Sequence, residues 1–457
     1  MKKALYTFKI YYMLYVLVAF TALLNGEVWL DIATYALVAF GSVLILMMMV
    51  QYKKYWRARN LYWILGFLAS YVLSSVMNIQ YGYVDNVKEM FWLAFPMLLL
   101  YIASQEYTYE EMVQEGQVLS FIYIVYTTLA SVVSIGMFFL GKSYKFQDGM
   151  GHHREIGYKW GRLWGVFDDP NHGATIILIG LILAIYYMMK HPKLIVKIGM
   201  VIAGVVQYIY IVLSDSRTAE IAMMAAIVIG FGMGTYQIVT KRKSSSQGIA
   251  LALLVCIGST VGVYASDKVI TEGMGKANAY VQSLRVQETQ KPKPKPNTQR
   301  AEDIEEDVSN GRFDIWVSAL EVANTSPIYG TSFRNIVPYT QDQVPDTYIV
   351  NLPNDATYDS MHNSVMDILV SQGIIGLILF FGLVGNTLWY LWKKIYRESV
   401  RIEGVALLYL TILAAIASAS LFISMAYYLN SPQTYMFWLS FGYFMAGMEK
   451  KYVEEKK

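Results

Sequence analysis

The chain has 457 residues, of which 55% are hydrophobic, and a formal net charge of +3. Its mean hydropathy of +0.37 and its repeated apolar runs, several close to the roughly 20 residues that span a bilayer, exclude an ordinary soluble protein of several domains. The single cysteine, Cys256, lies inside an apolar run, so a disulfide framework is also excluded. Because lipid offers the backbone no hydrogen bonds, the sequence predicts an all-α membrane protein that crosses the bilayer many times.

About twelve apolar segments are expected to form the membrane-crossing helices. The first is interpreted as a retained helix, because the apolar stretch lacks the small-residue cleavage site of a signal peptide. The segments lie at residues 8–24, 30–50, 61–77, 87–103, 118–140, 174–189, 194–213, 218–239, 248–265, 364–392, 404–423 and 433–448.

Clusters of lysine and arginine orient these segments, since basic residues accumulate in cytoplasmic loops. With twelve segments every cluster falls on one side, which is then the cytoplasm and holds both termini. The clusters lie at residues 2–3, 53–59, 190–193, 241–243, 393–401 and 450–451.

This topology divides the chain into three parts. Residues 1–265 hold nine spans and an outer segment at 141–173, residues 266–361 form one large extracytoplasmic loop, and residues 362–457 hold three spans and a cytoplasmic tail.

The large outer loop has its own internal organisation. A Lys-Pro repeat at 291–296 and acidic residues at 302–307 are interpreted as a solvated spacer. Residues 312–322 follow, and they predict an amphipathic helix on the outer membrane face or over a cavity. Its apolar residues at helical spacing are Phe313, Trp316, Val317 and Leu320.

Two arginines stand where outer helices are expected to begin. Arg217 lies in a tight turn between the seventh and eighth segments, and Arg312 opens the amphipathic helix. Backbone donors at a helix start and a guanidinium fork both favour a phosphate group. The alternatives are a snorkelling Arg217 or its pairing with Asp215 or Glu220, and pairing of Arg312 with the acidic residues at 302–307.

His362 and Asn363 immediately precede the tenth segment. The positive end of a helix disfavours imidazolium, so His362 is expected to stay neutral and able to accept a proton from a sugar hydroxyl. The alternative is a capping or satisfied polar residue near the interface.

Residues 162–173 lead into the sixth segment and include Arg162 and Asn171 as further candidates for lining a site. Adjacent Asp168 and Asp169 invite a metal interpretation, but neighbouring carboxylates seldom converge on one ion, and Asp-Pro-Asn is ordinary turn chemistry. No metal or other cofactor is therefore expected. The chain also lacks a glycine-rich phosphate loop, a Gly-x-Ser-x-Gly elbow and a His-Glu-x-x-His pair.

Four short motifs occur in a fixed order on the predicted outer side. They are Gly165-Val166-Phe167 with Pro170-Asn171, Ser214-Asp215-Ser216-Arg217, Arg312 with Trp316 and Leu320 and then Pro327-Ile328-Tyr329-Gly330, and His362-Asn363 followed by Gly373-Ile374-Ile375-Gly376. Over roughly residues 160–390 this pattern resembles the O-antigen ligase and polymerase family of bacterial membrane glycosyltransferases. The chain departs from the family's usual Gly-x-Gly at Gly330-Thr331-Ser332, which bears on the backbone geometry there.

The resemblance implies a metal-independent glycosyltransferase of the cytoplasmic (inner) membrane with an extracytoplasmic site. It would take a glycan from an undecaprenyl-pyrophosphate-linked oligosaccharide and pass it to a hydroxyl of an acceptor glycan. Arg217 and Arg312 would hold the pyrophosphate and His362 would act as the base, while Arg162, Asn171 and Asn363 would line the site. Flippase and chain-length regulator proteins are expected as partners, and nucleic acid is not.

Three functions remain open at this point. The favoured one is polymerisation of repeat units into a capsule, an exopolysaccharide or an O-antigen. A ligase would instead transfer a finished glycan to a lipid or protein acceptor. Twelve spans also suit a lipid-linked oligosaccharide flippase or transporter, although the large outer loop falls after the ninth span and matched halves are not evident.

Overall fold

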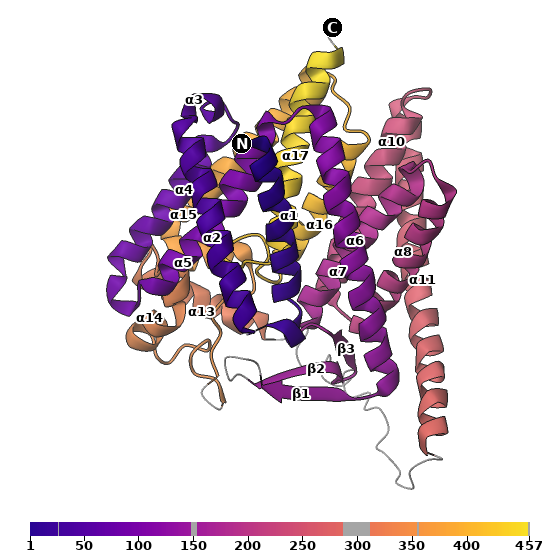
Figure 1. Ribbon diagram of the computed structural model, residues 1–457, viewed down its shortest axis with the longest axis horizontal. Helices are drawn as coiled ribbons and strands as arrows, with labels where there is room; N and C mark the ends of the chain where they lie inside the picture. The colour runs from indigo at the N-terminus through magenta and orange to yellow at the C-terminus, as the bar shows by residue number, and fades with distance from the viewer. Residues whose placement is uncertain (26, 148–152, 287–310, 354–355, 456–457) are drawn as a thin grey trace.

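The computed structural model describes residues 1–25, 27–147, 153–286, 311–353 and 356–455. A bundle of long helices makes up the body of the molecule, with both termini at one end and a small sheet at the other (Figure 1). The Lys-Pro repeat at 291–296 and the acidic residues at 302–307 lie outside the described residues.

Helices account for the chain before the sheet. The fourth predicted segment, which Pro96 interrupts, is a continuous helical run whose middle part is a π-helix beginning beside that proline. The elements are α1 (Lys2–Ala19), η1 (Ala22–Leu24), α2 (Val28–Val50), α3 (Tyr52–Tyr55), α4 (Leu61–Met77), η2 (Ile79–Tyr81), α5 (Val84–Ala94), η3 (Phe95–Ile102), η4 (Ala103–Glu106) and α6 (Tyr109–Leu140).

Helices also dominate the chain after the sheet. The elements are α7 (Pro170–Lys190), α8 (Leu194–Ser214), α9 (Arg217–Ala226), η5 (Ile227–Met233), α10 (Gly234–Val239), α11 (Ser245–Val286), α13 (Arg312–Thr325), η6 (Phe333–Asn335), α14 (Ile336–Gln343), α15 (Ser364–Trp392), η8 (Lys393–Arg397), α16 (Val405–Ala419) and α17 (Pro432–Glu455).

Each of the twelve predicted segments overlaps one of these helices. In the described part of the chain, eight helices are long and apolar enough to cross a membrane, and α4 and α16 are shorter apolar helices. The count of twelve spans therefore stays a prediction. The ninth segment differs most, because α11 continues to Val286 instead of ending near residue 265, so the predicted outer loop begins inside a helix.

The helical bundle is consistent with the predicted all-α membrane protein, and the outer segment at 141–173 adds a small sheet that the sequence did not predict. Strands β1 (Ser143–Gln147), β2 (His153–Lys159) and β3 (Arg162–Gly165) form an antiparallel sheet in the order β1-β2-β3. Trp160 and Gly161 join β2 to β3 as a two-residue turn with positive φ at both positions, which is the turn type that suits the twist of a hairpin. Such alternating strands are too short to register as membrane segments.

The amphipathic helix predicted at 312–322 is present as α13. Ile315, Ala319 and Val322 are buried, whereas Phe313 and Leu320 are exposed. The helix therefore packs its small apolar side chains on the protein and leaves larger ones on its outer surface.

The basic residues follow the arrangement that the sequence predicted within the molecule. Helix α3, which carries Lys53 and Lys54, lies at the same end as both termini, and the sheet and α13 lie at the opposite end (Figure 1). The side of a membrane that each end faces stays a prediction.

A buried ion pair joins the helices of the first, fifth and last predicted spans. The Lys9 ammonium of α1 contacts the Glu115 carboxylate of α6 at 2.5 Å, and it donates to Ser104 Oγ at 2.9 Å. The Tyr443 hydroxyl of α17 donates to the same carboxylate. Because Lys9 is 0% exposed and Glu115 only 7%, this network fixes how the three helices face one another.

Lys9→Met is expected to lower the free energy of unfolding by about 3–5 kcal/mol, because it leaves the Glu115 carboxylate buried without its counter-charge. The double variant Lys9→Met/Glu115→Leu is expected to recover most of that loss, since an apolar pair of similar volume is often neutral. Thermal unfolding of the protein in detergent measures both.

The control for this prediction is Lys2→Met, which removes an ion pair of similar length (2.6 Å) whose side chains are 44% and 39% exposed. An exposed pair contributes about 0–1 kcal/mol. Equal losses in Lys9→Met and Lys2→Met would contradict the role assigned to the buried pair.

Candidate functional site

Four helices, α7, α9, α13 and α15, begin at the end of the bundle that carries the sheet. Their first residues are Pro170, Arg217, Arg312 and Ser364. A helix N-terminus offers unpaired backbone N–H groups and a partial positive charge, which favour an anion. The question is then which side chains these four helix starts bring together.

The start of α7 is fixed by local capping. Asp169 Oδ1 accepts hydrogen bonds from the backbone N–H groups of Asn171 at 2.7 Å and His172 at 2.8 Å. The prediction that Asp169, Pro170 and Asn171 form a turn that starts a helix is therefore confirmed. Within the described residues, no group of three or more His, Cys, Asp or Glu is placed to hold a metal ion.

Arg162 and Asn171 tie the sheet to the turn that carries Arg217. The Arg162 guanidinium of β3 donates to the Ser214 carbonyl at 2.9 Å and to Asn171 Oδ1 at 3.0 Å. Ser216 also donates to Asn171 Oδ1 at 3.0 Å. Arg162 and Asn171 thus brace the α8–α9 turn, and their place in lining the site stays a prediction.

Arg217 is the first residue of α9, directly after the cap. Asp215 adopts a left-handed conformation with φ of 48°, and Ser216 accepts a hydrogen bond from the Ala219 backbone N–H at 3.3 Å. Glu220 lies within electrostatic reach of Arg217, so the alternative of an Arg217–Glu220 partnership remains open. The turn as a whole directs Arg217 to the end of the bundle where α13 also begins.

Arg312 and Arg217 lie close enough for their charges to repel. Burial lowers the pKa of the Arg312 guanidinium, the positive charge of Arg217 lowers it further, and the Asp169 carboxylate acts in the opposite direction. Two partly buried cations, of which Arg312 lies near a carboxylate, form a positively charged cluster whose mutual repulsion an anionic ligand would relieve. The alternative partners of Arg312 at residues 302–307 lie outside the described residues.

His362 belongs to the same cluster. Burial lowers the pKa of its imidazole below the ordinary value of 6.5, and Arg312 lowers it further, while Asp169 opposes the shift. The ring packs edge-on against Tyr358 with the ring centres 5.4 Å apart. This direction favours the neutral imidazole near pH 7. The sequence led to the same expectation from the helix N-terminus, whereas burial and Arg312 are the main causes in the structure.

The backbone around His362 is held in an uncommon conformation by Asp367 and Ser424, which the sequence did not single out, and by Trp316, which it did. His362 has φ of 49°, a left-handed value that costs energy for a residue other than glycine. The backbone N–H of Met361, the residue before His362, donates to Asp367 Oδ1 at 2.6 Å. The Met361 carbonyl accepts from the Trp316 indole of α13 at 3.2 Å, and Ser424 donates to the other oxygen of Asp367.

Asn363 is the cap of α15. Its side-chain oxygen accepts from the backbone N–H groups of Val365 at 2.9 Å and Met366 at 3.2 Å, and its amide donates to the Leu421 carbonyl at 3.0 Å. These contacts engage both ends of the amide, so its proposed place in lining the site stays a prediction.

His172 also lies beside this cluster, and the sequence analysis gave it no role. Its charge would act on His362. Gln433 of α17 donates to the His172 carbonyl at 3.0 Å and lies 3.3 Å from its Nδ1 atom. The only sequence signal for His172 was its position in the motif at residues 162–173, which leads into the sixth apolar segment.

The segment after α13 shows how the departure from Gly-x-Gly is accommodated. Ser332 takes the place of the second glycine and still adopts a positive φ of 66°. Its backbone N–H donates to the Ser371 carbonyl at 2.9 Å, and its hydroxyl donates to Asn86 Oδ1 at 2.6 Å. The left-handed geometry is therefore kept with a serine, stabilised by these two bonds.

In a comparison with protein families, residues 202–381 match a model described as O-antigen ligase. The matched region contains Arg217, Arg312 and His362, and it ends before α16. No curated protein matches the chain significantly. The match falls inside the region of roughly 160–390 for which the sequence motifs predicted this resemblance, and the prediction of the family is confirmed.

Proposed function

Since residues 202–381 place the chain in the O-antigen ligase and polymerase family, we propose that it polymerises glycan units from undecaprenyl-pyrophosphate-linked donors on the outer side of the cytoplasmic membrane. The observation that carries this proposal is that Arg312 interacts electrostatically with both Arg217 and His362, which joins the three residues in one cluster. They come from α9, from the start of α13 and from the residue before the α15 cap.

Each of these residues has a chemical role in the proposed reaction. Arg217 and Arg312 bind the pyrophosphate of the donor and neutralise the charge that grows on it as it leaves. An acceptor hydroxyl oxygen forms a bond to the anomeric carbon while the bond from that carbon to the pyrophosphate oxygen breaks. The hydroxyl proton passes to the neutral imidazole of His362, and undecaprenyl pyrophosphate is released.

Two features support positioning roles for residues around this cluster. Arg162 and Asn171 brace the turn before Arg217, and Asp367 holds the backbone at Met361. Because a misplacement of about 1 Å can reduce a rate by about 10², such braces are a reasonable requirement of a site assembled from four helices.

Deletion of the protein from its host tests the proposal and separates the two transfer reactions. A polymerase leaves single repeat units on the lipid carrier when it is lost, and this is the expected result. Intact long chains that remain on the carrier would instead indicate a ligase. If lipid-linked glycans and surface polysaccharide are both unchanged, the proposed transfer function is wrong.

A further inference from the structure

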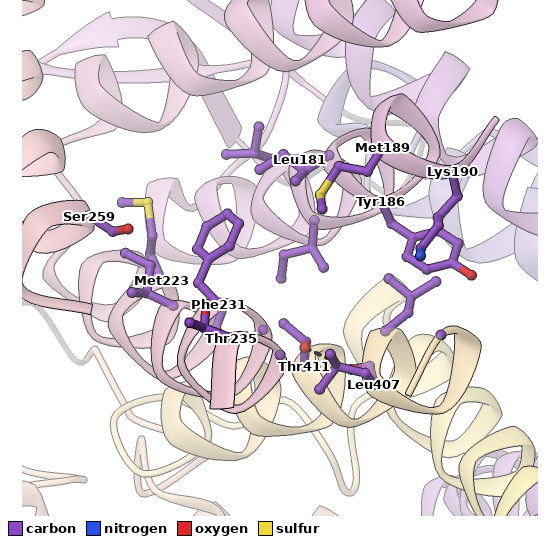
Figure 2. A pocket seen from close by; sticks show the side chains of 18 of the residues that line it. Leu181, Tyr186, Met189, Lys190, Met223, Phe231, Thr235, Ser259, Leu407 and Thr411 are labelled. Atoms are coloured by element: carbon purple, nitrogen blue, oxygen red, sulfur yellow. Dashed lines mark hydrogen bonds between the residues drawn. The ribbon is translucent and has the colours of Figure 1, made fainter. Parts of the chain in front are cut away.

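A large cavity lies between the helices of the bundle, but its walls do not suit a sugar. Its volume is about 820 Å³. Most of its lining is apolar, including Leu181, Met223, Phe231 and Leu407 (Figure 2). Sugar hydroxyls that were buried there without hydrogen-bond partners would be strongly disfavoured. The glycan of the proposed reaction therefore needs a different surface.

The tip of the β2–β3 hairpin carries a tryptophan that folding does not explain. Trp160 has φ of 52° and Gly161 has φ of 70°, in a two-residue turn between the paired residues Lys159 and Arg162. Such turns favour Asn, Asp or Gly at the first position, and a bulky residue is strained there. The indole is also 75% exposed, so burial does little to offset the strain. A strained residue of this kind points to a functional role.

Neighbouring side chains hold the Trp160 ring in place. Trp160 and Trp164 meet edge to face, with their ring centres 5.5 Å apart. The Lys159 ammonium lies 3.4 Å from the centre of the Trp164 ring and 4.8 Å from that of the Trp160 ring, so it contacts both. The Trp164 carbonyl accepts a hydrogen bond from the Tyr210 hydroxyl of α8 at 3.1 Å. The exposed ring thus rests on a fixed base, which reduces the ordering cost of binding a ligand.

The hairpin lies beside the candidate site. The Asp169 carboxylate acts electrostatically on Lys159, and it acts likewise on Arg312 and His362. Arg162, the residue after the turn, donates to the carbonyl of the last residue of α8 at 2.9 Å. A glycan of several sugars that reacts at His362 can therefore extend to the Trp160 ring.

The charges around the ring favour a neutral sugar. Lys159 is paired with Glu155 at 3.9 Å, and Arg154 is paired with Asp168 at 3.0 Å. Because each cation already has a counter-charge, neither requires the carboxylate of an acidic sugar. A neutral pyranose instead presents a face of C–H groups, whose small positive charge suits the negative face of an indole.

We propose that Trp160 is a sugar-binding platform, on which one neutral pyranose ring of the glycan stacks during transfer. The hydroxyl groups of that ring stay in contact with water. The inference rests on the proposed function, because it takes the glycan to react beside His362. Donor and acceptor glycans both carry such rings, and kinetics with each substrate varied in turn separates the two.

Trp160→Asn separates a binding role from a structural one. The substitution gives the turn the asparagine–glycine pair that its geometry favours, so the thermal unfolding temperature is expected to stay the same or to rise. The KM for glycan transfer is nevertheless expected to rise about tenfold, a typical effect of removing an aromatic contact. The kcat should change by less than about twofold, because the ring does not contact the reacting atoms.

Transfer is measured with the lipid-linked donor and with a free oligosaccharide of repeat units as the acceptor. A higher KM for the donor alone assigns the platform to the donor glycan, and a higher KM for the acceptor alone assigns it to the acceptor. Trp160→Tyr keeps an aromatic face and is expected to raise either KM by less than about threefold. Unchanged KM values for both substrates in Trp160→Asn would overturn the proposal.

Trp29→Ala is the matched control. Trp29 is 48% exposed near the start of α2. It lies at the same end of the bundle, since the Ala22 N–H in the preceding segment donates to the Val166 carbonyl, directly after β3, at 2.9 Å. A tryptophan that only anchors the protein at the membrane interface would behave alike at both positions. No change is expected in Trp29→Ala, and equal increases in KM in Trp29→Ala and Trp160→Asn would contradict a sugar platform.

Binding of sugar alone gives a readout that does not depend on transfer, and it decides the case if Trp160→Asn lowers the unfolding temperature. The probe is the repeat-unit oligosaccharide released by mild acid from the host's lipid-linked glycan, titrated into the purified protein in detergent. Its Kd is expected to rise about tenfold in Trp160→Asn and to stay unchanged in Trp29→Ala. Equal Kd values in the natural protein and Trp160→Asn, or no binding to the natural protein, would overturn the platform.

Failure of the platform and failure of the proposed function are distinguishable. If the natural protein binds the oligosaccharide through Trp160 but transfers no glycan, the proposed function fails and the sugar site stands. If Trp160→Asn binds and transfers glycan as the natural protein does, only the platform fails.

Discussion

Replacement of Arg217 or Arg312 by alanine is expected to lower kcat/KM for glycan transfer by about 10²–10³, the typical effect of removing one preorganised donor from a site of developing charge. The two guanidiniums lie near each other, and Arg312 also lies near Asp169. The leaving pyrophosphate gains negative charge during the reaction. Each arginine therefore contributes more to the transition state than to the bound donor. The measurement is initial transfer rate against donor concentration with the protein in vesicles.

Lysine substitutions refine the result for the two arginines. Arg217→Lys and Arg312→Lys keep the charge but lose the planar fork, so activity is expected to fall between that of the natural protein and that of the alanine variants. Arg242→Ala, in an exposed turn between α10 and α11, is the control and should leave the rate unchanged. Natural activity in both alanine variants would refute the pyrophosphate site.

Replacement of His362 by alanine is expected to reduce kcat/KM by about 10²–10⁴, the range for loss of general-base catalysis. Because burial and Arg312 lower the pKa of His362, the neutral form predominates at pH 7. The rate of the natural protein should fall only when the pH drops below this lowered pKa and the imidazole becomes protonated. The pH profile of kcat/KM reports this titration in the free enzyme.

The same profile measured in Arg312→Gln tests the electrostatic link between the two residues. Removing the positive charge makes protonation of His362 easier, so its pKa rises and the acid limb of the profile moves to higher pH. His191→Ala, after the other end of α7, is the control and should change neither the rate nor the profile. An acid limb that persists unchanged in His362→Ala would assign the titration to another group.

These predictions concern residues that approach one another from distant parts of the sequence. Arg217, Arg312 and His362 are separated by 95 and 50 positions, and the 24 residues before Gly311 are not described by the structure. Their proximity depends on how α9, α13 and α15 pack. The hydrogen bond from Trp316 to the Met361 carbonyl is one contact that brings two of these elements together.

Several features of this protein could be read from the sequence because they depend on neighbouring residues. The twelve apolar segments all overlap helices, since an apolar run in lipid must satisfy its own backbone hydrogen bonds. The cap at Asp169 and the helix start at Arg217 follow from side chains that bond within three residues. The family was also recognised from short motifs in order, and the match to residues 202–381 confirms it.

Tertiary structure alone decided the remaining features, because they depend on contacts between residues far apart in the chain. The sheet at Ser143–Gly165 was missed, since its strands are short and their pairing is not encoded in any one of them. Lys9 and Glu115 read as residues at the edge of a span and in an acidic loop, yet they form one buried pair across 106 positions. The cavity likewise exists only where α7, α10, α11 and α16 leave space between them, and such a space follows from packing rather than from local sequence.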